Sequence, residues 1–311
     1  QKELMITTIF SKSKPINYII VFSIMLIAYL VLGFKFNFFS NNSNGLVEHI
    51  FAFLGAFFSV LILNFIVLKN GLSQQNNYEI LVVALFFLAL PQSFLSIKII
   101  ASNLFILLAL RRIISVRSKK DLIKKVFDAG FLIGLSSVFY FWSILFFPLI
   151  IIALLFFSET KFQLYIIPFL GLLCVAIILV ALSVILHEDF TSLLPQNFSV
   201  NFNYTAYNSF QFIGAITLLL SFGLWSSLFY LADIKKKMRS YRPSYKIMFA
   251  ACILASCIVV IAPNKNGSEF LYLFSPLAVI FMNYIETIKE KWFKETFLAL
   301  IVVVPILLLM L

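Results

Sequence analysis

Charged side chains are scarce in this sequence of 311 residues: Asp, Glu, Lys and Arg make up 12% of it, against 62% hydrophobic residues. A water-soluble domain needs about 25% charged residues to cover its surface. Apolar stretches recur from Ile16 to the C-terminus, and the polar stretches between them are short. The sequence therefore excludes a separate soluble domain, and we expect a single transmembrane domain over residues 1–311.

Cysteine and acidic residues are also few. Cys174, Cys252 and Cys257 lie inside apolar stretches without a nearby His or Cys at metal-ligand spacing, so we interpret them as small buried hydrophobic residues. With only 13 acidic residues the net charge is +11, yet the basic residues form short clusters at the ends of apolar stretches. This distribution is typical of topology signals and anionic-lipid contacts, and it argues against nucleic acid as a partner.

The apolar stretches predict an all-α, polytopic bundle of about eleven membrane spans, because about 20 apolar residues cross the hydrocarbon core. Two stretches are too long for one helix and are interrupted, by Pro91-Gln92-Ser93 and by Tyr140-Phe141-Trp142-Ser143. We predict a hairpin of short helices at each interruption, with one long tilted helix over 127–157 as the alternative. The predicted spans are 15–34, 47–68, 80–96, 99–115, 127–140, 143–157, 162–186, 210–232, 247–263, 270–286 and 296–311.

The basic residues between these spans predict an orientation. With a cytoplasmic N-terminus, only Lys35, Lys98 and Lys265 lie outside, and the other 21 of the 24 Lys and Arg residues lie inside. The residue usage is typical of bacteria. We therefore expect a multi-pass protein of the bacterial inner membrane whose N-terminus is cytoplasmic.

The densest basic cluster is the predicted cytoplasmic segment 118–128, SKKDLIKKVFD. Helical spacing puts its apolar side chains on one face and its lysines on the other, which predicts an amphipathic helix in the lipid headgroup layer. We favour a topology anchor with solvated lysines, and the alternative is a contact for a lipid-linked phosphate or a cytoplasmic partner. The candidate contact residues are Lys119, Lys120, Lys124 and Lys125.

The predicted outer face holds four carboxylates, those of Glu48, Glu188, Asp189 and Glu269. Glu48, beside His49, is placed to act as a general base toward a substrate at the interface. His187, Glu188 and Asp189 begin the longest outer loop, 187–209, and are further candidate catalytic residues. Three contiguous residues rarely converge on one ion, so we predict no metal site. Our preferred interpretation of these residues is polar helix ends in water.

The same outer loop contains the segment 195–209, PQNFSVNFNYTAYNS, which alternates amide and aromatic side chains. Rings beside amides stack on sugars and hydrogen-bond to them, so Asn203, Tyr204 and Tyr207 are candidate binding residues. An interfacial loop or a protein contact is the alternative. Inside the spans ionisable residues are nearly absent, which argues against an ion-coupled transporter. Asn64 and Asn103 are expected to form hydrogen bonds between helices.

Three segments, Met5–Val21, Phe127–Phe157 and Ser275–Glu295, resemble an uncharacterised family of multi-pass inner-membrane proteins from flavobacteria and their relatives. A family start at Met5 would make Gln1–Leu4 a cloning or start-site remnant. More distantly, one long helix followed by an outer loop and paired short helices is similar to the GT-C glycosyltransferases, which use polyprenyl-phosphate-linked sugars. That similarity implies an acidic catalytic residue in the first outer loop. Residues 34–47 contain no Asp or Glu, and Glu48 is the nearest carboxylate.

We therefore predict a non-catalytic subunit of a bacterial envelope or export assembly, which contacts other envelope proteins and anionic lipid headgroups and needs no cofactor. The alternative is a GT-C-like transferase that takes a polyprenyl-phosphate-linked sugar at the outer face. In that case Glu48 is the base, loop 187–209 covers the substrate, and a divalent cation is the cofactor. A transporter is the third hypothesis.

Overall fold

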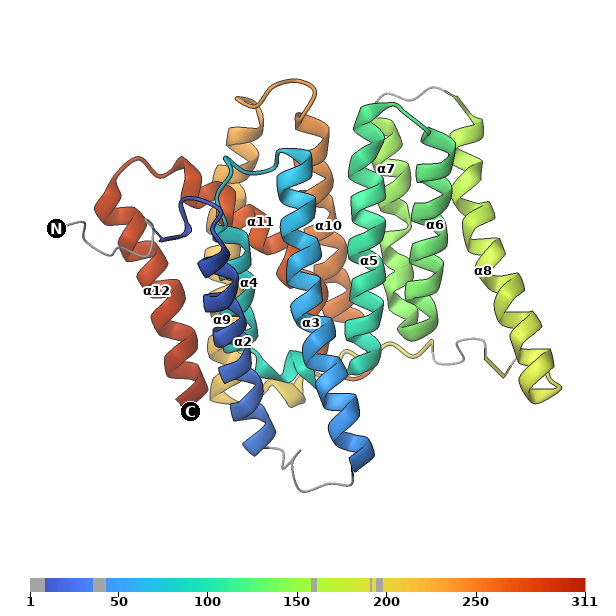
Figure 1. The fold of residues 1–311 in the computed structure, drawn as a ribbon, viewed down its shortest axis with the longest axis horizontal. Helices are drawn as coiled ribbons and strands as arrows, with labels where there is room; N and C mark the ends of the chain where they lie inside the picture. Colours follow the sequence, from blue (N-terminus) through green and yellow to red (C-terminus); the bar gives the residue numbers. More distant parts are fainter. Residues whose placement is uncertain (1–8, 36–42, 158–160, 191, 194–197, 311) are drawn as a thin grey trace. The chain divides into compact units, whose positions relative to one another are not determined.

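The computed structural model describes residues 9–35, 43–157, 161–190, 192–193 and 198–310, and these ranges contain helices and no strand. Eleven α-helices occur in them, and every predicted span coincides with a helix (Figure 1). Their bounds are α2 Pro15–Lys35, α3 Ser43–Asn70, α4 Tyr78–Ala89, α5 Ile97–Ser115, α6 Leu122–Phe139, α7 Pro148–Phe156, α8 Gln163–His187, α9 Phe210–Ile234, α10 Arg242–Ile261, α11 Leu271–Thr287 and α12 Lys291–Met310.

Eight helices in the described part of the chain are long and apolar enough to cross a membrane, so the chain is a multi-pass membrane protein. The eight are α2, α3, α5, α8, α9, α10, α11 and α12. Helix α4 has 12 residues and extends over only about 18 Å, less than the hydrocarbon thickness of about 30 Å. Helix length therefore supports fewer complete spans than the predicted eleven.

Both predicted interruptions are confirmed. Pro91 begins a short 3₁₀ helix, Pro91–Phe94, after α4 has ended, because proline has no N–H to continue the helical hydrogen bonds. Tyr140 has extended backbone angles, φ −147° and ψ 106°, and ends α6. A second 3₁₀ segment, Phe141–Phe146, leads into α7. The alternative of one continuous helix over 127–157 is wrong.

The predicted amphipathic helix over 118–128 does not form as a separate element. Lys119 and Asp121 have positive φ angles, 54° and 49°, a conformation that interrupts a right-handed helix. Helix α6 begins after them, at Leu122, and continues without a break to Phe139. Residues 122–128 are therefore the first turns of a longer helix, Ser118 ends the 3₁₀ helix Val116–Ser118, and residues 119–121 form the loop between them.

The chain divides into two compact units. Unit 1 comprises Gln1–Ile97, Asn203–Lys237 and Asn264–Leu311, and unit 2 comprises Lys98–Phe202 and Met238–Pro263. Unit 1 thus contains α2, α3, α4, α9, α11 and α12. Unit 2 contains α5 from its second residue, together with α6, α7, α8 and α10. Each unit is built from segments that are distant in the sequence.

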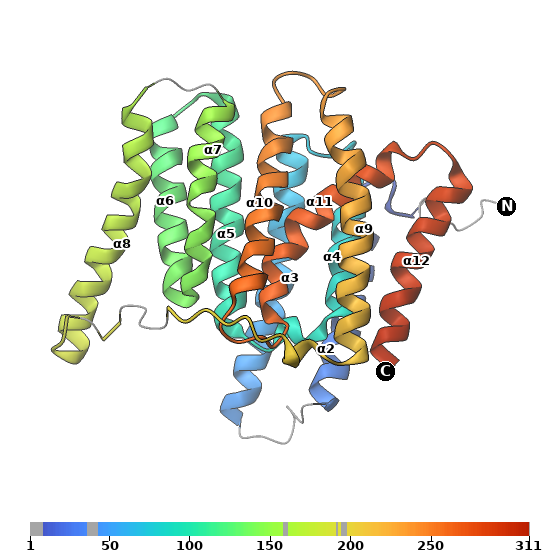
Figure 2. The same ribbon diagram turned by 180° about the vertical axis from the view of Figure 1, so that it is seen from behind.

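The core of unit 1 is formed by α4 and α11. All 12 residues of α4 are buried, as expected for a helix that is apolar on every side. Phe86 and Phe87 of α4 pack against Phe274 of α11, with ring centres 5.6 Å and 5.3 Å apart, and Phe86 also contacts Phe281. Helix α11 packs against α9 as well (Figure 2). Each end of α11 carries a cluster of polar side chains, and this aromatic layer lies between the two clusters.

In unit 2 the closest helix contact joins α6 and α8. A Cβ added to Gly130 would lie 2.3 Å from the carbonyl oxygen of Pro168, and one added to Gly171 would lie 2.6 Å from the amide nitrogen of Phe131. Glycine at both positions lets the two backbones touch, as small residues do between membrane helices. Ser136 connects α6 to the neighbouring segments through hydrogen bonds with Ser102 and Ser143.

Candidate functional site

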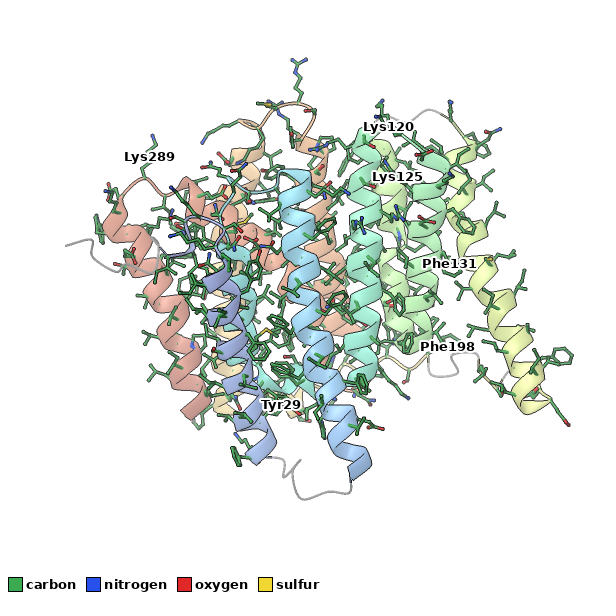
Figure 3. All side chains as sticks on the ribbon, in the orientation of Figure 1. Tyr29, Lys120, Lys125, Phe131, Phe198 and Lys289 are labelled. Carbon is green, nitrogen blue, oxygen red and sulfur yellow. The ribbon has the colours of Figure 1, made fainter. Side chains whose placement is uncertain are left out.

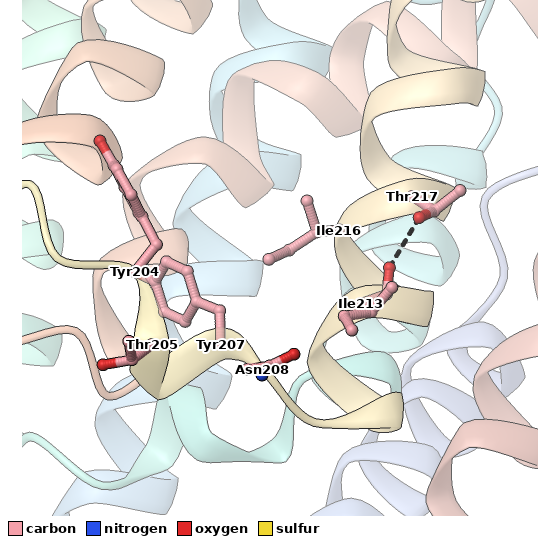
Figure 4. Close-up of a pocket in the computed structure, with 7 residues that line it drawn as sticks. All are labelled: Tyr204, Thr205, Tyr207, Asn208, Ile213, Ile216 and Thr217. Atoms are coloured by element: carbon pink, nitrogen blue, oxygen red, sulfur yellow. Dashed lines mark hydrogen bonds between the residues drawn. The ribbon is translucent and has the colours of Figure 1, made fainter.

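A cavity of about 610 Å³ in unit 1 lies beside the first turns of α9 (Figure 4). One side is polar and aromatic and comes from the loop before α9, and the other side is apolar and comes from the helix itself. The helix begins here because the Ser209 hydroxyl accepts a hydrogen bond from the amide of Phe212, a typical N-cap. The lining residues are Tyr204, Thr205, Tyr207, Asn208, Ile213, Ile216 and Thr217.

Glu269, which is fully buried, is hydrogen-bonded to the cavity wall. The Tyr207 hydroxyl and the Gly267 amide both donate to its Oε1, the latter at 3.2 Å. Its Oε2 has no hydrogen-bond partner among the described residues. An unpaired buried carboxylate oxygen is energetically costly.

A glycine is needed beside this carboxylate. Gly267 has a φ of +93°, and a Cβ there would lie 2.7 Å from the Phe212 ring. Positive φ is readily adopted by glycine alone. Gln92 lies next to it and donates a 3.0 Å hydrogen bond to Gln211. The Glu269 loop is thereby held against both α9 and the turn after α4.

Lys265 completes the group of polar residues, which we name the Tyr207 site: Tyr204, Tyr207, Lys265 and Glu269. Its Nζ lies 4.5 Å from the centre of the Tyr204 ring and 6.0 Å from that of Tyr207, within the range of cation–π attraction. Burial lowers the pKa of the Lys265 ammonium from its ordinary value, and the Glu269 carboxylate opposes that effect. The Tyr207 site thus combines the amine of Lys265, the carboxyl group of Glu269 and the phenols of Tyr204 and Tyr207 next to an amphipathic cavity.

The structure brings together only part of the predicted site. Tyr204 and Tyr207 line the cavity, and Asn203 shapes the loop by accepting a 3.0 Å hydrogen bond from the Thr205 amide. Glu269 was counted among the outer carboxylates but not selected as a candidate. The sequence offered one indication that Glu269 is buried, namely its position directly before the apolar run from Phe270. A carboxylate at such a position needs hydrogen-bond donors from inside the protein.

The predicted catalytic residues lie elsewhere in the chain. Glu48 is exposed on α3, whereas Glu188 and Asp189 are exposed after α8 in unit 2. His187 is the last residue of α8, and its side chain lies outside the described residues. Glu48, Glu188 and Asp189 are not among the residues that line the cavity. Among the residues that the structure describes, no group of three His, Cys, Asp or Glu side chains is placed to hold a metal ion.

A second polar cluster occupies the other end of α11. Glu79 is fully buried at the start of α4, and its Oε1 accepts a 2.9 Å hydrogen bond from Asn64 of α3. Asn64 also accepts from the Tyr18 hydroxyl, which confirms its predicted role between helices. Glu286 is the penultimate residue of α11 and accepts a hydrogen bond from the amide of Gln74 at 2.9 Å. Glu79 and Glu286 thus lie at the ends of their helices.

The predicted lysine contacts do not form one group. Lys119, Lys120 and Lys124 are exposed, whereas Lys125 is half-buried and its Nζ donates a 2.8 Å hydrogen bond to the carbonyl oxygen of Ser115. Figure 3 shows Lys120 at the end of unit 2 and Lys125 closer to the helices. Lys125 therefore helps to hold the loop before α6, and the other three side chains are exposed.

Comparison with known proteins assigns the chain to a family but identifies no activity. The model of the DUF6427 family, described as a family of unknown function, matches residues 5–310. No curated protein and no solved structure matches the chain.

Proposed function

The chain belongs to the DUF6427 family, whose function is unknown, and we propose that it is a non-catalytic, multi-pass membrane subunit of a bacterial envelope or export assembly. One observation carries the proposal. Three carboxylates of unit 1, the buried Glu269 and Glu79 and the partly exposed Glu286, accept hydrogen bonds from other segments of their own chain: from Tyr207, Asn64 and Gln74, respectively.

Such contacts favour a structural role for these acids. A general acid or base has to come within about 3 Å of the proton that it transfers. The carboxylates of unit 1 instead connect loops to the buried helices, and the cavity beside α9 is lined by no Asp or Glu. Loops that are held in this way present a fixed surface to a neighbouring protein, which suits a subunit whose task is to position partners.

Co-purification from native membranes tests the subunit role. A tagged full-length chain, extracted in a mild detergent, is expected to elute with at least one other envelope protein in a stoichiometric ratio. The matched variant Glu269→Gln keeps an acceptor oxygen for Tyr207 and is expected to retain the same partner. A chain that elutes alone after extraction in several mild detergents would contradict the proposal.

A second candidate function, GT-C-like sugar transfer from a polyprenyl phosphate, is favoured by one specific observation. The free Oε2 of Glu269 is adjacent to Tyr207, whose side chain lines a cavity with one aromatic side and one apolar side. Aromatic side chains suit a sugar and the apolar wall suits an isoprenoid chain. In this alternative Glu269 takes the role that the sequence suggested for Glu48, and a divalent cation would assist the phosphate.

Paired glutamine variants separate the two functions. In a strain that lacks the gene, a transferase predicts that Glu269→Gln lowers the rate of sugar transfer from the polyprenyl-phosphate donor by at least about 100-fold, so that the lipid-linked donor is retained. The control Glu48→Gln, which removes an exposed carboxylate, is expected to behave as wild type. Mass spectrometry of extracted lipids gives the readout. If deletion changes the glycans while both variants restore them, neither carboxylate is catalytic and the subunit role is favoured.

A transporter remains the third candidate. The two polar clusters of unit 1 are separated along α4 and α11 by the packed rings of Phe86, Phe87 and Phe274. A polar substrate that moved between the clusters would have to displace this aromatic layer. The packing of unit 1 therefore favours the other two functions.

A further inference from the structure

A second cavity, of about 470 Å³, lies in unit 2 at the start of α6 and α8. Three segments form it: the loop before α6, the first turn of α6, and the residues at the start of α8. The described part of its lining combines lysines with apolar side chains and one acid. The lining residues are Lys119, Asp121, Leu122, Ile123, Lys124, Lys161, Gln163 and Leu164.

The described side chains that line this cavity carry a net positive charge. Among the described residues of the lining, Lys119, Lys124 and Lys161 contribute three ammonium groups, and Asp121 contributes one carboxylate. Lys161 lies 37 residues beyond Lys124 in the chain, as their numbers show, and the fold brings it to the same cavity. Three lysines that line one cavity suit a phosphate, because hydrogen bonds between ionised partners are about twice as strong as neutral ones.

The apolar part of the cavity indicates where the ligand's remaining atoms lie. Ile123 is 60% exposed although it belongs to the lining, and Leu164, which also lines the cavity, is only 3% exposed. Phe162, directly before α8, is 76% exposed. Exposed apolar side chains beside lysines are typical of segments that lie at the boundary between headgroups and acyl chains. The ligand is therefore expected to carry an apolar chain next to its anionic group.

We propose that this cavity binds the phosphate headgroup of an anionic membrane lipid, with Lys119, Lys124 and Lys161 around the phosphate and Ile123 against the acyl chain. Its volume lies within the range of about 300–1,000 Å³ typical of small-molecule sites. Lys125 donates hydrogen bonds to Ser115 and Ser118 and so connects the two ends of the nearby loop. A loop that is already held in this way loses little conformational entropy when a ligand binds. The inference is independent of the subunit and transferase functions.

Lipid binding to the purified full chain tests the site. Short-chain phosphatidic acid, short-chain phosphatidylcholine with the same tails, and inorganic phosphate are titrated in a neutral detergent and followed by native mass spectrometry. We expect saturable binding of phosphatidic acid, at least about tenfold tighter than that of the other two probes. Lys161→Gln and Lys124→Gln are each expected to weaken it by about three- to tenfold, as for a partly exposed charged contact.

Lys120→Gln is the matched control, because Lys120 belongs to the same loop, carries the same charge and does not line the cavity. It is expected to bind phosphatidic acid as wild type does. Gel filtration and thermal melting identify any variant that fails to fold, and Lys124→Gln then replaces Lys161→Gln. Equal loss in Lys120→Gln and Lys161→Gln would overturn the proposal, because it would indicate diffuse surface charge. Binding of phosphatidylcholine or inorganic phosphate as tight as that of phosphatidic acid would also overturn it.

Discussion

Replacing Gly130 by alanine is expected to lower the free energy of unfolding by about 2–3 kcal/mol. The added methyl group would lie 2.3 Å from the carbonyl oxygen of Pro168 and 2.8 Å from its Cα. Both are backbone atoms, so the overlap cannot be relieved by a side-chain rotation, and α6 and α8 have to separate. Alanine also favours the helical conformation by about 1 kcal/mol over glycine, so a net loss would show that the steric cost dominates. Reversible unfolding in mild detergent gives the measurement.

Gly134, one helical turn further along α6, provides the control. A Cβ there would meet the side chains of Val175 and Leu172 at 3.0 Å and 3.2 Å. Because these side chains can adjust by a few tenths of an ångström, Gly134→Ala is expected to change the free energy of unfolding by less than about 1 kcal/mol. A Gly130→Ala protein as stable as wild type would show that the α6 and α8 backbones do not touch.

Asn64→Leu is expected to destabilise the protein by about 3 kcal/mol. The Asn64 amide donates to Glu79 Oε1 at 2.9 Å and to Asn77 Oδ1 at 3.3 Å, and its oxygen accepts from the Tyr18 hydroxyl at 3.1 Å. Leucine would remove all three bonds and leave the fully buried Glu79 carboxylate without its side-chain donor. Chemical denaturation of the purified protein measures the loss.

Asn103→Leu is the matched comparison, since Asn103 is also an asparagine buried in an apolar helix. Its Nδ2 has no hydrogen-bond partner among the described residues. Leucine has a similar volume and removes an unpaired buried donor, so this variant is expected to match wild type or to exceed its stability by up to about 1 kcal/mol. Equal destabilisation by the two variants would refute the assignment of Asn64 as the connection between α2, α3 and α4.

Most helix positions followed from local sequence. Runs of apolar residues set the helices, because a backbone in lipid has to satisfy its own hydrogen bonds. Pro91 marked one interruption and the cluster at Tyr140 marked the other, and both are helix ends. The start of α6 was not predicted. The lysine pattern continues through 118–128, and only the positive φ angles of Lys119 and Asp121 separate the loop from the helix.

Site residues were predicted less completely than helices. The amide and aromatic pattern selected Tyr204 and Tyr207, which do line a cavity. Glu269 follows Tyr207 by 62 positions, and its place before the apolar run from Phe270 does not indicate which side chains it meets. Lys161 likewise belongs to a different segment from Lys119 and Lys124. Residues that meet through folding leave no spacing signal in a single sequence.

The sequence by itself determined that this is an α-helical membrane protein with little charge, where its helices break, and where its lysines cluster. These properties depend on hydropathy and on the backbone chemistry of proline, which act over one helix length. Only the tertiary structure decided which acids are buried and which lysines share a cavity. Burial of Glu79 and Glu269 depends on donors such as Asn64 and Tyr207 in other helices and loops, and such partners are specified by packing between distant segments.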